Sequence, residues 1–207
     1  MLYHVLDAVL GSGTKVQILR ALLPLRSAVT GREAQRLAGV RSDQGARQAL
    51  RELVELGVLQ REHSSASHLY RVNLKYELLP PLTALFEAEA GRVQTLKQML
   101  RGALKRAEVT GRVESIMLAG GAGREGAGAE TALLVVATGE KGAAKVRDAL
   151  VGAGDRIFAR TGARITVEAL SLERFRTRHR EGDPLLKKVE ADGRVLIGAA
   201  FHELVGA

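Results

Sequence analysis

The chain has 207 residues, of which 46% are hydrophobic and 26% charged, a balance typical of a folded globular protein. It contains no cysteine, which excludes disulfides and thiolate metal sites and fits a reducing compartment. No apolar run approaches the ~20 residues that a membrane-spanning helix needs, and the first residues lack the pattern of a signal peptide. We therefore expect a cytoplasmic protein that does not enter a membrane.

The net charge is +8, and it is unevenly distributed. Residues 1–76 carry 11 Lys and Arg against 6 Asp and Glu, whereas residues 77–207 carry 20 against 17. The denser positive charge at the N-terminal end favours a polyanionic partner there. The alternative is that arginine is common throughout the chain and raises its isoelectric point everywhere.

Short helical periods separated by small polar turns fill the N-terminal part. The apolar spacing predicts a first helix over 14–23. Thr30 and Glu33 have the spacing of a capping box and so begin a second helix over 31–38. Gly39 ends that helix, because glycine accepts the left-handed conformation of a C-cap.

A third helix follows, with Ser42 as its N-cap and an end near Leu56. Its apolar residues recur at helical spacing and are expected to face inward. Arg and Gln side chains can make paired hydrogen bonds to guanine and adenine edges, so the outer face suits the DNA major groove. The alternative is an ordinary solvated helix face. The residues left on the outer face are Asp43, Gln44, Arg47, Gln48 and Arg51.

Residues 58–73 alternate between apolar and polar and predict a β-hairpin with a polar tip at 64–67. We expect Leu59, Leu69 and Val72 to pack on the helices. The two histidines of the hairpin can alternatively bind a metal, but no cysteine and no carboxylate cluster accompanies them, so we expect no metal site. The polar side chains expected on the outer side and at the tip are Arg61, His63, His68 and Arg71.

A short helix, a turn, a donor-rich helix and a basic hairpin, in that order, resemble a winged helix-turn-helix. Residues 50–62, Leu-Arg-Glu-Leu-Val-Glu-Leu-Gly-Val-Leu-Gln-Arg-Glu, closely resemble the junction of recognition helix and wing in bacterial and archaeal winged-helix regulators. The resemblance implies that domain 1–76 binds double-stranded DNA. It implies base contacts from Gln44, Arg47, Gln48 and Arg51, with Arg41, Ser42, Arg61, His63, His68 and Arg71 at phosphates or on the wing.

Residues 77–107 form a separate connecting region, either one long helix or two abutting ones. The apolar stripe of this region is broad and must be buried, either against the chain's own domains or against another chain. Winged-helix proteins commonly bind palindromic sites as two-fold dimers. We therefore expect a homodimer with this connecting helix as its interface.

From residue 108 to 207, strand-like and helix-like runs alternate and predict an α/β domain, so that the whole chain is α+β. A glycine-rich stretch over 119–129 separates the first two strands. The strands are expected at 113–118, 131–137 and near 164–170, with a helix near 141–153.

This region resembles a small nucleotidyltransferase domain of the antitoxin type. In that family a Gly-Ser loop precedes an Asp-x-Asp motif, whose two carboxylates hold magnesium ions against the nucleotide phosphates. This chain has Gly120 and Gly121 in place of Gly-Ser, and Glu130 and Ala132 at the two acidic positions. Glu168, on a later strand, is a candidate for a third carboxylate but does not restore the pair.

With one of the two metal-bridging carboxylates missing, the resemblance implies a catalytically inactive domain without catalytic residues, cofactor or metal. Its glycine-rich loop is either a nucleotide- or anion-binding site or only a turn. The sequence thus predicts a DNA-binding transcriptional regulator whose inactive domain senses a ligand, docks a partner or aids dimerisation. The alternatives are an active magnesium-dependent nucleotidyltransferase and an antitoxin-like module that binds a partner protein. The candidate nucleotide or anion site is Gly120, Gly121, Gly123, Arg124 and Glu130.

Overall fold

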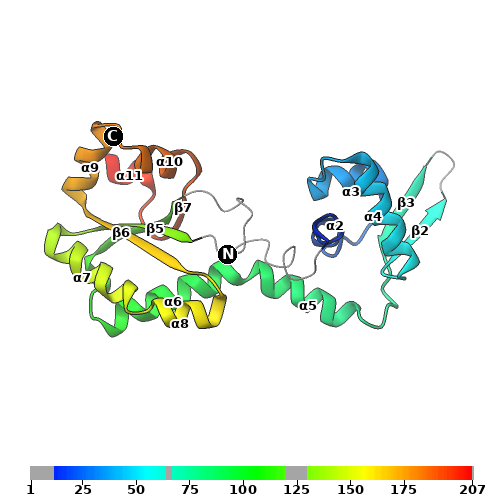
Figure 1. The fold of residues 1–207 in the computed structure, drawn as a ribbon, viewed down its shortest axis with the longest axis horizontal. Coiled ribbons are helices and arrows are strands. Elements are labelled where there is room, and N and C mark those ends of the chain that lie inside the picture. The colour runs from blue at the N-terminus through cyan, green and yellow to red at the C-terminus, as the bar shows by residue number, and fades with distance from the viewer. Residues whose placement is uncertain (1–11, 64–66, 120–129, 207) are drawn as a thin grey trace. The chain divides into compact units, whose positions relative to one another are not determined.

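The computed structural model describes residues 12–63, 67–119 and 130–206, which form a mixed α+β structure with two sheets (Figure 1). The chain divides into two compact units, the first ending at Ala90 and the second beginning at Gly91. We call residues 12–90 the N-terminal unit and residues 91–206 the C-terminal unit. No helix in the described ranges is long and apolar enough to span a bilayer.

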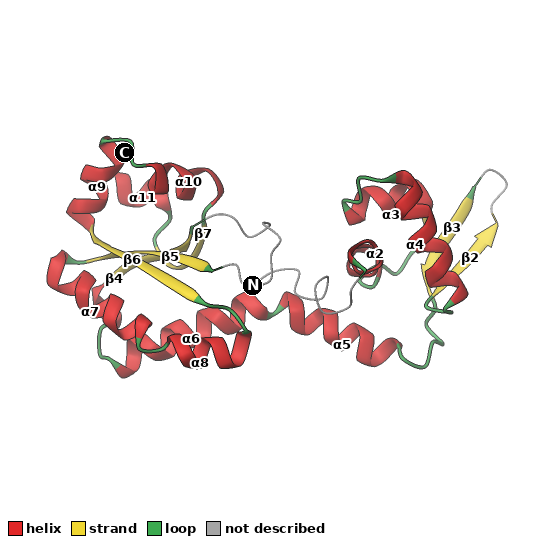
Figure 2. Cartoon of the chain, in the orientation of Figure 1, coloured by secondary structure: helices red, strands yellow, loops and turns green. Residues whose placement is uncertain are grey.

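The N-terminal unit combines helices with a small antiparallel sheet whose strand order is β1-β3-β2. Figure 2 shows the helices α2 to α4 together with the β2–β3 hairpin. Its elements are α2 (Gly13–Leu22), β1 (Val29–Thr30), α3 (Gly31–Ala38), α4 (Asp43–Glu55), β2 (Leu59–His63), β3 (His68–Val72) and α5 (Leu79–Ala90).

Local capping chemistry sets both ends of α3 and the start of α4. The Thr30 hydroxyl accepts a hydrogen bond from the backbone N–H of Glu33 at 3.2 Å, and the Ser42 hydroxyl accepts one from Gly45 at 3.0 Å. Gly39 ends α3 with a φ of 66°, in the left-handed region that glycine favours. The predicted bounds of α3 are confirmed, and those of α2 and α4 are confirmed to within one residue.

The hairpin corrects one prediction. Tyr70, and not Leu69, is buried together with Leu59 and Val72, while Leu69 is only half-buried. Successive strand residues point to opposite faces, so residues 69 and 72 cannot share one. The cross-strand pairs Leu59–Val72 and Arg61–Tyr70 therefore lie on the face that packs on the helices.

The connecting region is two helices, α5 and α6 (Arg92–Arg106), separated at Gly91. Phe86 of α5 packs into the core of the N-terminal unit, and Arg20 of α2 donates a hydrogen bond to Glu89 at 2.8 Å. On α6, Leu96 and Leu100 pack into the core of the C-terminal unit. The apolar stripe is therefore largely buried within the chain itself, which weakens the sequence argument for a dimer interface at this segment.

The C-terminal unit is built on a four-stranded mixed sheet with strand order β6-β5-β4-β7. β5 and β6 are parallel, and the other two pairs are antiparallel. After α6 and a short 3-10 turn at Thr110–Arg112, its elements are β4 (Val113–Leu118), β5 (Thr131–Ala137), α7 (Gly139–Val151), α8 (Gly154–Thr161), β6 (Ile165–Ser171), α9 (Leu172–Arg180), α10 (Pro184–Asp192), β7 (Arg194–Gly198) and α11 (Phe201–Val205).

Helices cover both faces of this sheet, with α6, α7 and α8 on one side and α9, α10 and α11 on the other (Figure 1). Leu133 and Val135 point into the first layer, whereas Leu134 and Val136 point into the second, where they meet Phe175 of α9. This alternation explains why β5 is a continuous apolar run, since both of its faces are buried. The strands predicted before residue 172 are confirmed to within one residue.

The edge strand β7 was not predicted. Its pairing with β4 needs glycine at position 198, where φ is 82° and an added Cβ would lie 2.0 Å from the carbonyl oxygen of Glu114. The Ser115 hydroxyl strengthens the same junction by donating to the carbonyl of Ala199 at 2.7 Å. The short apolar run within β7 (Arg194–Gly198) does not by itself predict pairing with β4. The backbones of Gly198 and Glu114 approach each other only after the chain has folded.

Candidate nucleic-acid interface

The fold presents α4 with one buried and one exposed face. Ala46, Ala49, Leu50 and Leu53 are buried in the core of the N-terminal unit. Six of the predicted contact residues lie in exposed positions on α4 or just before it: Arg41, Ser42, Gln44, Arg47, Gln48 and Arg51. The sequence prediction of an outward, donor-rich face is therefore confirmed.

The long side chains of this face bind one another. Arg47 forms an ion pair with Asp43 one turn earlier. Arg51 Nη2 donates to Gln48 Oε1 at 2.6 Å, and Gln48 Nε2 donates to Glu52 Oε1 at 2.7 Å. Exposed pairs of this kind contribute little to stability. A nucleic acid can therefore replace them at low cost.

Lys15 of α2 completes this chain of contacts, with its Nζ 2.5 Å from Glu52 Oε2. Hydrogen bonds from Lys15 and then Gln48 lower the pKa of Glu52, so this carboxylate stays charged beside the α4 face. Sequence reasoning missed Lys15, because only packing of α2 on α4 brings it near the third helix.

The hairpin contributes a second group of side chains. His63 and His68 form a cross-strand pair with ring centroids 4.2 Å apart, on the same face of the hairpin as Arg61. Partial desolvation, and then the charges of His63 and Arg61, lower the pKa of His68. Figure 1 shows the beginning of α4 and the far end of the hairpin strands at the same end of the unit.

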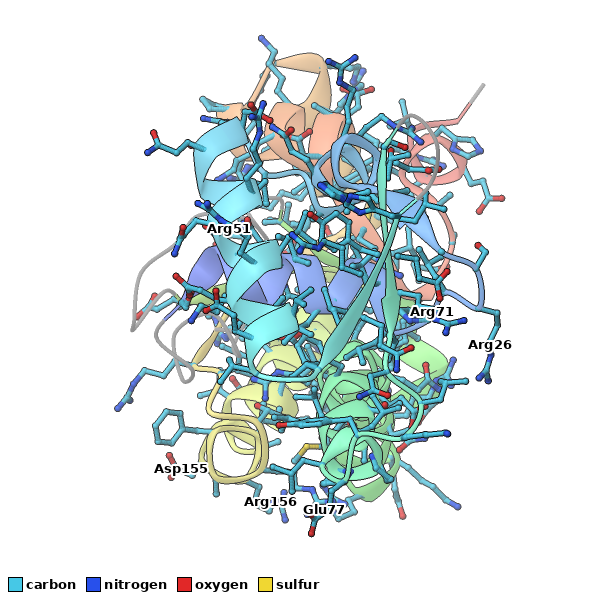
Figure 3. The ribbon with its side chains drawn as sticks, turned by 90° about the vertical axis from the view of Figure 1, so that its right-hand side faces the viewer. Arg26, Arg51, Arg71, Glu77, Asp155 and Arg156 are labelled. Carbon is cyan, nitrogen blue, oxygen red and sulfur yellow. The ribbon has the colours of Figure 1, made fainter. Side chains whose placement is uncertain are left out.

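Arg71 does not belong to that group. It pairs with Gln60 in the register and so lies on the opposite face of the hairpin from Arg61. Its guanidinium lies 2.8 Å from Glu62 Oε1 and donates to Gln60 at 3.0 Å. In Figure 3, Arg51 extends to one side of α4, while Arg71 lies beyond the hairpin on the other side. Arg71 therefore lies on the outer side of the hairpin, as predicted. The prediction is wrong for Arg61, His63 and His68, which lie on the side that packs on the helices, because strand residues two apart share a face.

The division into units also changes the charge argument. Residues 4–90 carry 11 Lys and Arg against 9 Asp and Glu, a net charge of +2. Residues 91–207 carry 20 against 14, a net charge of +6. The three carboxylates of residues 77–90 fold with the N-terminal unit, so the excess of positive charge belongs to the C-terminal unit.

The C-terminal unit has a cavity of about 250 Å³ where β4, β5 and β6 meet α10. Ala119, Ala132, Thr166 and Glu168 are among its lining residues. Ala132 pairs with Thr166 in the parallel register, so this position of β5 presents a methyl group to the cavity. Glu130 is exposed and precedes β5. Among the described lining residues, Glu168 is the one ionisable side chain.

Arg178 of α9 binds Glu168, with Nη1 2.6 Å from Oε1. The same guanidinium lies 2.7 Å from Asp183, whose carboxylate caps α10 by accepting hydrogen bonds from Leu185 and Leu186. Arg178 lowers the pKa of Asp183, and the two carboxylates raise the pKa of Arg178. Glu168 is thus held in an ion-pair network that the sequence did not indicate.

The remaining candidates for a nucleotide site, Gly120, Gly121, Gly123 and Arg124, lie outside the described residues. In the described part of the chain no three His, Asp or Glu side chains gather in a group that could hold a metal ion.

Comparison with protein families, with curated proteins and with solved structures found no match to this chain. The resemblances to winged-helix regulators and to small nucleotidyltransferases are therefore hypotheses that rest on the residues of this chain.

Proposed function

We propose that the N-terminal unit is a winged helix-turn-helix that binds duplex DNA, and that the protein is a sequence-specific transcriptional regulator. The single observation that carries this proposal is the exposed face of α4, with Gln44, Arg47, Gln48 and Arg51 on one side of a helix whose other side is buried. The order helix, strand, helix, helix, hairpin supports it, as does the pairing of β1 with β3.

In this proposal α4 enters the major groove. Arginine and glutamine present hydrogen-bond donors in the geometry that purine edges accept. Ser42 and the free N–H groups at the start of α4 hold a phosphate. Arg61, His63 and His68 extend the contact along the neighbouring backbone, because they lie on the helix side of the hairpin.

The experiment selects fragments bound by the full chain from genomic DNA and then measures affinity for the enriched site. Arg47→Ala is expected to lower specific affinity by about 1–3 kcal/mol and to relax base preference at one position. Arg71→Ala is the matched control, since it removes an exposed arginine from the opposite face of the hairpin. Selection without any enriched sequence would contradict the proposal. An equal loss of affinity in both variants would contradict the assignment of α4 as the reading helix.

The proposal includes a two-fold dimer. Fewer apolar side chains are exposed for its interface than the sequence predicted, because most of those on α5 and α6 are buried within the chain. Leu78, just before α5, and Leu85, within it, remain exposed, with 57% and 40% of their surface accessible. Dimers of DNA-binding domains read inverted repeats. Enriched fragments containing such repeats, together with a dimeric mass in solution, are the expected result.

We also propose that the C-terminal unit does not transfer nucleotides and instead senses a ligand or docks a partner. The specific observation is the cavity beside Ala132, which is smaller than most ligand sites and mainly apolar. In the resembled family two carboxylates hold the magnesium ions, whereas Glu168 is the one ionisable side chain among the described lining residues and is already paired with Arg178. Labelled nucleotide with magnesium is expected to give no product. Incorporation that Glu130→Gln abolishes would instead establish an active transferase.

A further inference from the structure

The helix α6 carries five cationic residues and no carboxylate over Arg92–Arg106. None of the other described helices has as many cations without an acidic residue. This composition contributes much of the excess positive charge of the C-terminal unit. Arg92 is engaged at the start of the helix, where it donates to the carbonyl of Thr161.

The other four cations of α6 have no acidic partner within residues 12–63, 67–119 and 130–206. Among the described residues no carboxylate lies within 4.0 Å of Lys97, Arg101, Lys105 or Arg106. On α4, by contrast, the cation Arg47 is paired with Asp43. Carboxylates in the described ranges therefore do not neutralise the charge of these four residues.

These cations share a face with amide donors. Gln94, Gln98, Arg101 and Lys105 are exposed at spacings of four, three and four residues, which places them on one side of the helix. The opposite side packs into the core through Leu96, Leu100, Ala103 and Leu104. Lys97 and Arg106 lie at the edges of the exposed side. We call Lys97, Arg101, Lys105 and Arg106 the α6 cations.

Helix stability alone does not explain this pattern. Lys105 and Arg106 lie in the last turn, where cations interact favourably with the helix dipole. Lys97 and Arg101 lie more than one turn before the end and gain little from it. Like charges four residues apart, as in Lys97–Arg101 and Arg101–Lys105, destabilise a helix. An anionic partner along the helix would turn this repulsion into attraction.

We propose that the α6 cations form a second DNA contact of the protein, one that binds backbone phosphates without reading base sequence. Charge complementarity with a polyanion carries this assignment, and the two glutamines add neutral donors suited to phosphate oxygens. The inference rests on the proposed DNA binding and deepens it. Its consequence is that part of the affinity comes from the C-terminal unit.

The test measures the salt dependence of duplex binding by the full chain. The variant carries Lys97→Gln, Arg101→Gln and Lys105→Gln, three exposed or half-buried changes to another good helix former. The slope of log affinity against log salt concentration is expected to fall by about 0.9 for each phosphate that the protein no longer neutralises. Affinity for the enriched site and for random duplex should fall by the same factor, which leaves their ratio unchanged.

The matched control removes the same charge elsewhere in the C-terminal unit, through Arg180→Gln, Lys187→Gln and Lys188→Gln on α9 and α10. Its slope is expected to equal that of the unchanged protein. A second variant, Lys97→Arg with Lys105→Arg, keeps the charge and should keep the slope, which distinguishes an effect of charge from an effect on folding. Circular dichroism of each variant checks that the helix content is retained.

The outcomes separate this inference from the proposed function. An unchanged slope, with Arg47→Ala still lowering specific affinity, overturns the α6 contact and leaves the regulator proposal intact. A reduced slope in a protein without sequence preference supports the α6 contact and contradicts the regulator. Loss of binding to phosphatidylserine vesicles, with no change in the DNA slope, overturns the assignment to DNA in favour of a membrane surface.

Discussion

In the N-terminal unit the exposed cations of α4 and of the hairpin lie mostly beside acceptors, whereas in the C-terminal unit the α6 cations do not. Arg47 meets Asp43, and Arg71 meets Glu62. Lys97 and Arg101 have no such neighbour among the described carboxylates. Net charge averaged over a stretch of sequence therefore says little about which surface attracts a polyanion. The boundary of each folded unit and the local pairing of charges decide it.

The largest effects are expected from core truncations that destabilise one unit and leave the other folded. Phe175→Ala removes a fully buried ring that meets Phe201 edge-on at 5.1 Å, and Leu50→Ala truncates the core side of α4. We expect losses in the free energy of unfolding of about 3–5 and 2–5 kcal/mol respectively. Hydrogen exchange should show each loss in the unit that carries the change. Simultaneous loss of protection in both units would show that they do not unfold separately.

Each unit has a glycine at positive φ, and the surroundings of the two differ. Gly198→Ala forces a Cβ onto the carbonyl of Glu114 and should cost about 2–4 kcal/mol, because the β4–β7 backbone must move. Gly39→Ala meets no atom within 4 Å and should cost about 1–2 kcal/mol from backbone strain alone. Denaturant titration measures both. Equal costs would mean that the close approach at β7 relaxes easily.

Ser42 and Ser171 are the N-caps of α4 and α9, and they differ in burial. Ser42→Ala removes an exposed cap of α4 and should cost about 1 kcal/mol. Ser171→Ala removes a buried cap of α9 whose hydroxyl also donates to Glu140 at 2.6 Å, so it should cost more than Ser42→Ala. Thermal unfolding of the two variants compares them. A larger effect at Ser42 would contradict the reasoning from burial.

The smallest expected effect concerns pH and rests on the proposed DNA contact. The lowered pKa of His68 means that this ring gains its charge at more acidic pH than an ordinary histidine. In the free protein this lowers stability slightly as pH falls through the unfolded-state value near 6.5. Near a phosphate the added charge instead favours binding. DNA affinity should therefore rise a few-fold from pH 7.5 to 5.5 and become flatter in His68→Gln, and an unchanged profile would place His68 away from the DNA.

Much of the local structure follows from the sequence, because it depends on residues close together in the chain. Thr30 and Glu33 mark the start of α3, Gly39 marks its end, and Ser42 marks the start of α4. Helix periodicity identified the outward face of α4, and apolar runs identified β4, β5 and β6. These signals act within one or two turns, or along one strand, so no tertiary information is required to read them.

Contacts between residues far apart in the sequence could be identified only from the tertiary structure. The register of the hairpin places Arg71 on the opposite face from Arg61. The packing of α2 on α4 brings Lys15 to Glu52, and the position of α9 beside the sheet brings Arg178 to Glu168. Local sequence signals are thus sufficient to predict the capped helices and the donor-rich face of α4. The fold decided which charges are paired, because pairing depends on side chains that meet only after distant elements pack.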